Sequence, residues 1–190
     1  LRDTLKIVTT AREAEYAIYN GKVVVDGVKR KSVHHGIGLM DVVELAGVSD
    51  IYRLVPKKGH LLEPIKIKSS EKSVKLVKVT SKTSLRKGKM QIGFHDGRSL
   101  ISDTKVKVGD SCLMQVPEQK INEVLPLEKG SKVLVTKGVN AGQIADVKEI
   151  KEGTFVLPKR ALLSFGNREI EIPSELVMVV GKKEPVIQVA

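Results

Sequence analysis

The sequence predicts an α+β protein that consists mainly of short β-strands. A short amphipathic helix near the start of the chain runs directly into a β-hairpin signal. Short apolar runs separated by turn residues then recur from residue 51 onward, a spacing typical of compact β domains. Hydrophobic residues make up 41% of the 190 residues and charged residues 29%, which is a globular composition with enough material for a core.

The first predicted element is a helix that begins near Ala11. Thr10 and Glu13 have the spacing of a capping box, in which the two side chains satisfy each other's backbone amides. Asn20-Gly21 ends the helix, since glycine adopts the left-handed conformation found at helix C-termini. The apolar residues of this helix recur at three- and four-residue intervals and share one face: Ala11, Ala14, Ala17 and Ile18.

Two further features lie before and after this helix in the sequence. Before it, Leu1, Leu5 and Val8 have the spacing of one face of an earlier helix, so we expect the chain to be preceded by an N-terminal extension. After it, Asp26-Gly27 lies between Val23–Val25 and a second apolar run, which predicts a hairpin that leads into Lys29, Arg30 and Lys31. A strand is predicted at 38–45 with a turn at Gly47, and residues 1–47 form the first predicted domain.

Residues 48–125 are predicted to form a basic central β domain. A second Asp-Gly pair, Asp96-Gly97, predicts another hairpin turn, and Pro117 and Pro126 bracket a short connection. Residues 126–190 form the third predicted domain, in which Gly138 and Gly142 bracket a tight loop between two strands. The other strands are predicted at 51–55, 61–67, 74–79, 90–94, 111–116, 154–157, 169–172 and 176–180.

The charge of the chain points to a polyanionic partner. The formal net charge is +11 and the pI is about 9.7, and residues 48–125 carry 16 basic against 8 acidic side chains. Between Lys66 and Lys89 the only acidic residue is Glu71, which favours phosphate contact over an ordinary solvated surface of mixed charge. Aromatic residues make up only 3%, so recognition of backbone and shape is expected rather than base stacking.

Catalytic and metal chemistry find little support in the sequence. The four histidines, including His34-His35, and the single Cys112 are too scattered for a metal site, and Cys112 is expected to pack in the core. Asp96 is the best catalytic candidate, but a hairpin turn explains it without a reaction. No nucleophile elbow, P-loop or dinucleotide fingerprint occurs, and no apolar run reaches the ~20 residues that span a bilayer. We therefore expect no enzyme activity, cofactor, metal, small-molecule substrate or membrane partner.

Three stretches of the chain resemble known RNA-binding modules. The helix and hairpin of residues 10–28 resemble the S4-type RNA-binding domain, which has a pair of short helices and a hairpin. Residues 127–150 resemble the KOW motif of small SH3-like barrels, although Ala145 stands where many relatives have a second glycine. Glycine suits position 142, because a loop that presents backbone amides to a phosphate leaves little room for a Cβ.

The order of these modules resembles the S4e family of small-subunit ribosomal proteins of archaea and eukaryotes. Further matching stretches include 38–43, 53–60, the central Gln-Ile-Gly-Phe-His-Asp-Gly-Arg at 91–98, 107–110 and 179–182. The resemblance implies a structural and assembly role in the cytoplasmic ribosome, with small-subunit ribosomal RNA and neighbouring ribosomal proteins as partners. Two alternatives stay open: a free RNA-binding regulator of the KOW type, and an RNA-modifying enzyme that uses Asp96.

Basic and loop residues from all three predicted domains are expected to contact RNA, mainly through phosphates. These candidates are Arg12, Lys22, Lys29, Arg30, Lys31, Lys57, Lys58, Lys66, Lys68, Lys75, Lys78, Lys82, Arg86, Lys87, Lys89, Lys137, Asn140 and Gly142.

Overall fold

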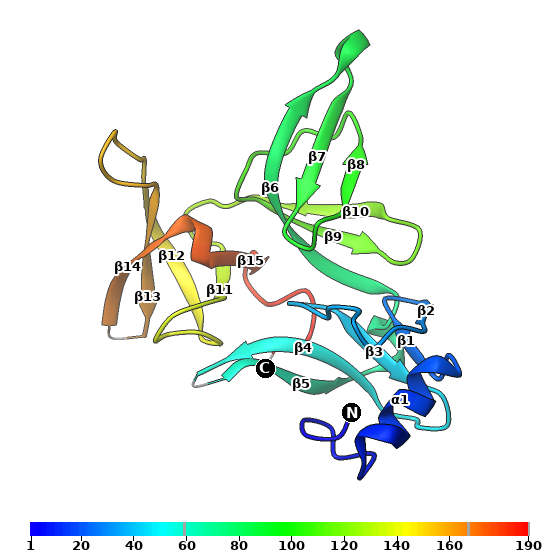
Figure 1. Cartoon of the computed structure of the whole chain (residues 1–190). Helices are drawn as coiled ribbons and strands as arrows, with labels where there is room; N and C mark the ends of the chain where they lie inside the picture. Colours follow the sequence, from blue (N-terminus) through cyan, green and yellow to red (C-terminus); the bar gives the residue numbers. More distant parts are fainter. Residues whose placement is uncertain (59, 167, 190) are drawn as a thin grey trace.

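The computed structural model describes residues 1–58, 60–166 and 168–189, and it confirms the mainly β fold class. In these residues, three antiparallel sheets of five strands each surround the centre of the molecule (Figure 1). One α-helix and three short 3-10 helices accompany the sheets in the described part of the chain. We call each sheet, together with its connecting segments, a unit. The contacts between the three units create the surfaces described below.

The first sheet has the strand order β2-β1-β3-β4-β5. Val43 of β3 pairs with Tyr52 of β4, so the sheet crosses the domain boundary predicted at residue 47. Asp26 and Gly27 both have positive φ values, 50° and 76°, which confirms the predicted tight turn between β1 and β2. The strands are β1 (Val23–Val25), β2 (Val28–Arg30), β3 (Val42–Leu45), β4 (Ile51–Lys57) and β5 (His60–Ile67).

The second sheet has the order β10-β9-β6-β7-β8 and is built around the long strand β6. The first half of β6 is buried, whereas residues 80–84 are exposed, because this half runs with β7 into a hairpin that projects from the molecule (Figure 1). The segment between Pro117 and Pro126, predicted as a connection, contains strand β10. The strands are β6 (Val74–Ser84), β7 (Met90–Phe94), β8 (Ser99–Ile101), β9 (Ser111–Gln115) and β10 (Lys120–Leu125).

The third sheet has the order β14-β13-β12-β11-β15, in which the last strand returns to pair with the first. The strand predicted at 154–157 is wrong: these residues form an exposed loop between β12 and β13. A strand that the sequence did not predict, β13, follows the loop. The strands are β11 (Lys132–Val135), β12 (Ile144–Lys151), β13 (Arg160–Phe165), β14 (Arg168–Pro173) and β15 (Val177–Gly181).

Helix α1 (Ala11–Tyr19) confirms the predicted capping box. The Thr10 side chain accepts a hydrogen bond from Glu13 N at 3.2 Å, and the Glu13 carboxylate accepts one from Thr10 N at 3.1 Å. No residue of α1 is fully buried, and α1 is the only α-helix in the described residues, so the pair of helices implied by the S4-type resemblance is not present there. The earlier helix predicted through Leu1 and Leu5 is also wrong. Residues 3–5 form a turn instead, and the side chains of Leu1 and Leu5 pack on the first sheet.

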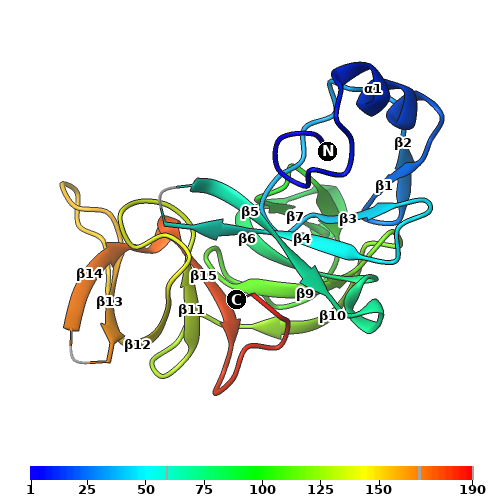
Figure 2. The ribbon, with the colours of Figure 1, turned by 90° about the horizontal axis from the view of Figure 1, so that it is seen from below.

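The largest hydrophobic cluster contains residues of all three units, and smaller clusters lie within the first and second sheets. The largest cluster of buried residues lines the third sheet and also includes Met40, Val55, Leu76 and Leu125 from the other two units. The tail after β15 turns back toward the centre of the molecule, where Ile187 is buried in the same cluster (Figure 2). Cys112 is fully buried in the core of the second sheet, as predicted, and burial raises the pKa of its thiol to about 11.

Gly142 is required by packing between units. It has a φ of +82°, and a Cβ at this position would lie 2.5 Å from the backbone oxygen of Pro56 in β4 and 3.0 Å from Lys57 Cα. The close neighbour that excludes a side chain is thus the first sheet of the same chain. This contact gives Gly142 a structural role that the sequence did not indicate.

We expect Gly142→Ala to lower the free energy of unfolding more than Gly138→Ala does. Both glycines have positive φ, which costs an alanine about 1–2 kcal/mol, but nothing lies within 4 Å of a Cβ at Gly138. The contact with Pro56 should add about 1–3 kcal/mol for Gly142→Ala. Urea denaturation of the two variants measures the difference, and equal losses would contradict the close contact.

Candidate nucleic-acid interface

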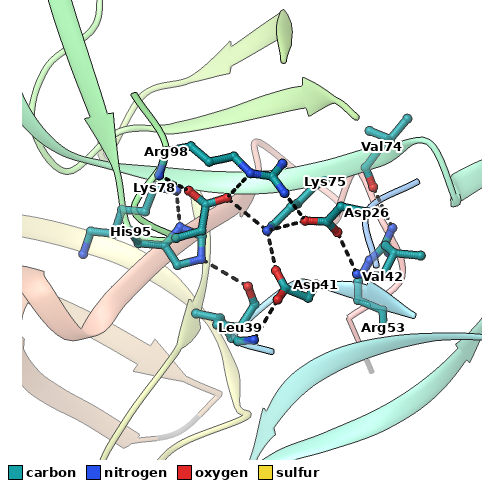
Figure 3. Close-up of polar contacts among 12 residues, drawn as sticks. Asp26, Leu39, Asp41, Val42, Arg53, Val74, Lys75, Lys78, His95 and Arg98 are labelled. Carbon is teal, nitrogen blue, oxygen red and sulfur yellow. Dashed lines mark hydrogen bonds and ion pairs between the residues drawn. The ribbon is translucent and has the colours of Figure 1, made fainter. Parts of the chain in front are cut away.

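A buried cluster of charges joins the first two sheets at the centre of the molecule. Lys75 on β6 is completely buried, and its ammonium donates to Asp26 Oδ2 at 2.9 Å, to Asp96 Oδ2 at 3.0 Å and to Asp41 (Figure 3). Arg98 adds a second cation, with Nη2 2.6 Å from Asp26 Oδ2. We call these five residues the Lys75 cluster. Its carboxylates come from two hairpin turns and from the residue before β3, so one ammonium fixes three segments.

The charges of the Lys75 cluster stabilise one another. Burial alone would lower the pKa of Lys75, but Asp26 and Asp41 more than offset this and raise its pKa above the ordinary value. Burial disfavours the charged form of Asp96 too, which for a carboxyl group would raise the pKa. The charge of Lys75 and hydrogen bonds from Lys75 and Arg98 instead hold the pKa of Asp96 below its ordinary value. The surroundings therefore favour the charged forms of both Lys75 and Asp96.

A second buried cation ties the C-terminal tail to the first sheet. The guanidinium of Arg53 on β4 donates to Glu71 Oε2 at 2.8 Å, to Val74 O at 3.0 Å and to Gln188 O at 3.0 Å. Glu71 Oε2 also accepts from Gln188 N at 3.1 Å. Glu71, the single acidic residue between Lys66 and Lys89, therefore pairs with a buried arginine of the first sheet.

Lys78 joins the second sheet to the third. This residue is 7% exposed, and its ammonium donates to the backbone oxygens of Ser174 at 2.7 Å and Glu175 at 2.8 Å. Burial lowers its pKa to about 8. The neighbouring His95 bridges the same region: its Nδ1 accepts from Lys78 N at 3.1 Å, and its Nε2 lies 3.2 Å from Leu39 O, which assigns the proton to Nε2 (Figure 3). Burial lowers the pKa of His95 as well.

The β6–β7 hairpin carries a set of exposed cations, of which Lys82 also donates a hydrogen bond to Val106 O at 3.1 Å. Lys82, Arg86 and Lys89 are exposed on the part that projects from the second sheet, and Arg86 lies in the 3-10 turn at its tip. The sequence contains no acidic residue between Glu71 and Asp96, and both of these carboxylates are engaged inside the molecule. Lys87 belongs to the same tip by sequence, and its side chain lies outside the described part. We call Lys82, Arg86 and Lys89 the hairpin cations.

The other predicted contacts lie outside the β6–β7 hairpin and differ in exposure and pairing. Lys57 pairs with Glu63 and Lys66 pairs with Asp50, which reduces the charge that these two lysines offer to a phosphate. Arg30 and Lys137 line a groove of about 1210 Å³ between the three units. The following predicted residues are exposed, and no ion pair is recorded for them in the described part of the chain: Arg12, Lys22, Lys29, Lys31, Lys58, Lys68 and Lys137. Asn140 and Gly142 are partly buried.

Comparison with known proteins identifies the family. The sequence profile of the ribosomal family S4e matches residues 48–121. The small ribosomal subunit protein eS4 of Methanothermobacter thermautotrophicus is 38% identical over 190 residues, which cover 98% of this chain and 78% of that protein. The chain belongs to the S4e family of ribosomal proteins. The Korarchaeum cryptofilum eS4 protein is 40% identical over 191 residues, covering 99% and 79% of the two chains.

A solved S4e structure also has the same fold. The crystal structure of the 30S ribosomal protein S4e from Thermoplasma acidophilum matches with a TM-score of 0.81 and 33% identity, and the match covers 95% of this chain and 91% of that one. The three-unit arrangement is therefore an S4e architecture. In the described residues, no helix is long and apolar enough to cross a membrane, and no three His, Cys, Asp or Glu side chains gather as a metal site.

Two of the predicted RNA contacts in this S4e chain are wrong. Lys75 and Lys78 lie in a lysine-rich segment, which predicts that they belong to the basic surface. They are buried and donate their hydrogen bonds to partners inside the protein, so neither ammonium can reach a phosphate. The reason is their position along β6: residues 75–79 are buried on both faces of the strand, whereas Lys82 lies in its exposed half.

Sequence reasoning also missed the partners of Lys75. Asp26 and Asp96 were recognised only as turn residues, and each does occupy a tight turn, but their carboxylates meet at Lys75. Asp26 is 49 residues from Lys75, and no local pattern links the two. The only available signal was that both Asp-Gly turns follow apolar strands, which places their aspartates at sheet ends.

We expect Lys75→Met to destabilise the protein by about 3–5 kcal/mol, because it leaves buried carboxylates without their shared cation. Lys72→Met is the matched control. Lys72 is about half exposed and pairs with Glu44 at 3.4 Å, so its loss should change the free energy of unfolding by less than about 1 kcal/mol. Urea denaturation at pH 7 measures both, and a Lys75→Met variant as stable as Lys72→Met would refute the role of the cluster.

Asp96→Asn should lower stability at pH 7 by about 1–3 kcal/mol, and this difference from the unmodified protein should shrink in acid. Because the pKa of Asp96 is lower in the folded state, its stabilisation is present above the ordinary value of 3.8 and is lost as the pH falls through the folded value. Unfolding measured at pH 7 and at pH 3 tests this, with exposed Asp103→Asn as the control. A difference that stays constant between the two pH values would contradict the pairing.

Proposed function

We propose that this chain is a structural constituent of the small ribosomal subunit in the cytoplasm, where it binds ribosomal RNA and acts in translation and subunit assembly. The curated relatives that it matches are named small ribosomal subunit proteins, and the chain spans nearly four-fifths of their length. The observation that carries the proposal is the β6–β7 hairpin. It extends a set of cations into solvent without any acidic side chain to neutralise them.

This geometry suits binding to a folded RNA by its backbone. Lysine and arginine side chains on a projecting hairpin can enter the space between RNA segments and replace the counterions of several phosphates. The cations of the first unit and Lys137 add separate contacts, so the protein would join RNA segments that lie on different sides. Buried ion pairs keep the three units in fixed positions while it does so.

We propose further that the chain catalyses no reaction. Asp96, the best catalytic candidate, has its carboxylate engaged by Lys75 and by the backbone amide of Arg98 at 3.1 Å. A general base or nucleophile needs an oxygen that reaches the substrate, and this one is held by partners inside the protein. Asp96→Asn should accordingly leave every RNA modification intact.

Sedimentation tests the proposed function directly. The chain should migrate with small ribosomal subunits in a one-to-one ratio after a high-salt wash of a cell extract. A free RNA-binding regulator would stay at the top of the gradient, and this result would overturn the proposal.

We expect removal of the hairpin cations to weaken binding to small-subunit RNA and to reduce its salt dependence. For Lys82→Ala, Arg86→Ala and Lys89→Ala combined, the slope of log affinity against log salt should fall in magnitude by about 0.7–0.9 per lost phosphate contact. Lys148→Ala with Lys151→Ala is the matched control, because both lysines pair with glutamates of β14. Filter binding over a salt series measures the slopes, and equal slopes for the two variants would show that the hairpin does not contact phosphates.

A further inference from the structure

A second projecting hairpin, β12–β13, ends in exposed apolar side chains. Phe155 is completely exposed, Val156 is 82% exposed and Leu157 is 47% exposed. We call these three residues the apolar tip. The loop between β12 and β13 that carries the tip extends from the third sheet (Figure 1). A group of adjacent exposed apolar side chains marks a contact surface more often than a single exposed apolar side chain does.

The loop that carries the apolar tip has internal structure. Thr154 N donates to Leu157 O at 2.8 Å, and Leu157 N donates to the Thr154 hydroxyl at 3.2 Å. At its base, a Cβ on Gly153 would lie 2.9 Å from Lys159 N, so the two sides of the hairpin approach closely there. The turn therefore holds Phe155 outward, and little ordering entropy is lost when a partner covers it.

The charges around the apolar tip are balanced, in contrast to the β6–β7 hairpin. The segment 148–160 contains four cations, and each one is paired with a glutamate. Lys159 lies 2.7 Å from Glu152, and Arg160 lies 3.0 Å from Glu171. The β6–β7 and β12–β13 hairpins thus differ in chemistry: one offers exposed cations for which the described residues show no ion pair, and the other offers apolar side chains on a neutral base.

We propose that the apolar tip docks into an apolar pocket of a neighbouring protein in the small subunit. The proposal rests on the proposed function, since it requires the chain to be assembled there. A neutral base gives no attraction for phosphates, which supply much of the affinity for RNA. Phe155 has the shape of a protein-interface anchor, a large rigid side chain that buries its full surface on insertion. The protein thus binds RNA with one hairpin and a protein with the other.

Photocrosslinking from position 155 tests the identity of the partner. Phe155 is replaced by the photoreactive benzoylphenylalanine, the chain is assembled into small subunits, and purified subunits are irradiated and treated with ribonuclease. We expect a ribonuclease-resistant crosslink to a single protein of the subunit, identified by mass spectrometry. A crosslink that is degraded by ribonuclease would show that Phe155 contacts RNA, and this result or no crosslink at all would overturn the proposal.

Release kinetics supply the second measurement. Phe155→Ser should increase the rate of release from assembled small subunits about tenfold or more, whereas its affinity and salt slope for isolated small-subunit RNA should be unchanged. Ile101→Ser is the control, because Ile101 is 58% exposed on the outer strand β8 of another unit. Equal release rates for both variants would refute docking. If the unmodified chain failed to sediment with small subunits, the proposed function itself would fail, so the two failures are distinguishable.

Discussion

The arrangement of this S4e chain depends on one buried ammonium. Lys75 lies where two hairpin turns and the start of β3 meet, and it is shared by three carboxylates. A buried charge is costly unless all of its hydrogen bonds are made, so the three segments must occupy their places together. The first and second sheets are thereby fixed relative to each other. Hydrogen bonds from Lys78 and Arg53 likewise connect the third unit and the C-terminal tail to the other sheets.

This internal use of charge determines which surface remains for a partner. The basic segment between Lys66 and Lys89 divides at the middle of β6: its buried half supplies lysines to the interior, and its exposed half and the hairpin tip supply the hairpin cations. Glu71 pairs with the buried Arg53 and leaves those cations unopposed. In segment 148–160 of the third unit each cation is paired with a glutamate instead, and the exposed residues at the tip of its hairpin are apolar. One small protein therefore presents two hairpins suited to different partners.

Local patterns in the sequence predicted much of the fold. The capping box at Thr10, the turn at Asp26 and most strands of the first two units follow from neighbouring residues, and the structure confirms them. The sequence could not predict which lysines are buried, because the partners of Lys75 come from turns far away in the chain. The apolar run at 154–157 has the composition of a strand, but it extends beyond the paired ends of β12 and β13. Composition alone does not distinguish an apolar run that packs inside from one that meets a partner.

The central claim is that the lysines of this chain have two separate roles, one inside the protein and one on RNA. Acetylation of lysines in the free protein and in assembled small subunits, read by mass spectrometry, tests it most directly. Lys82 and Lys89 should react in the free protein and be protected in the subunit, whereas Lys75 should be unreactive in both. Rapid acetylation of Lys75 in the free protein, or equal reactivity of Lys82 and Lys89 in both states, would contradict the account.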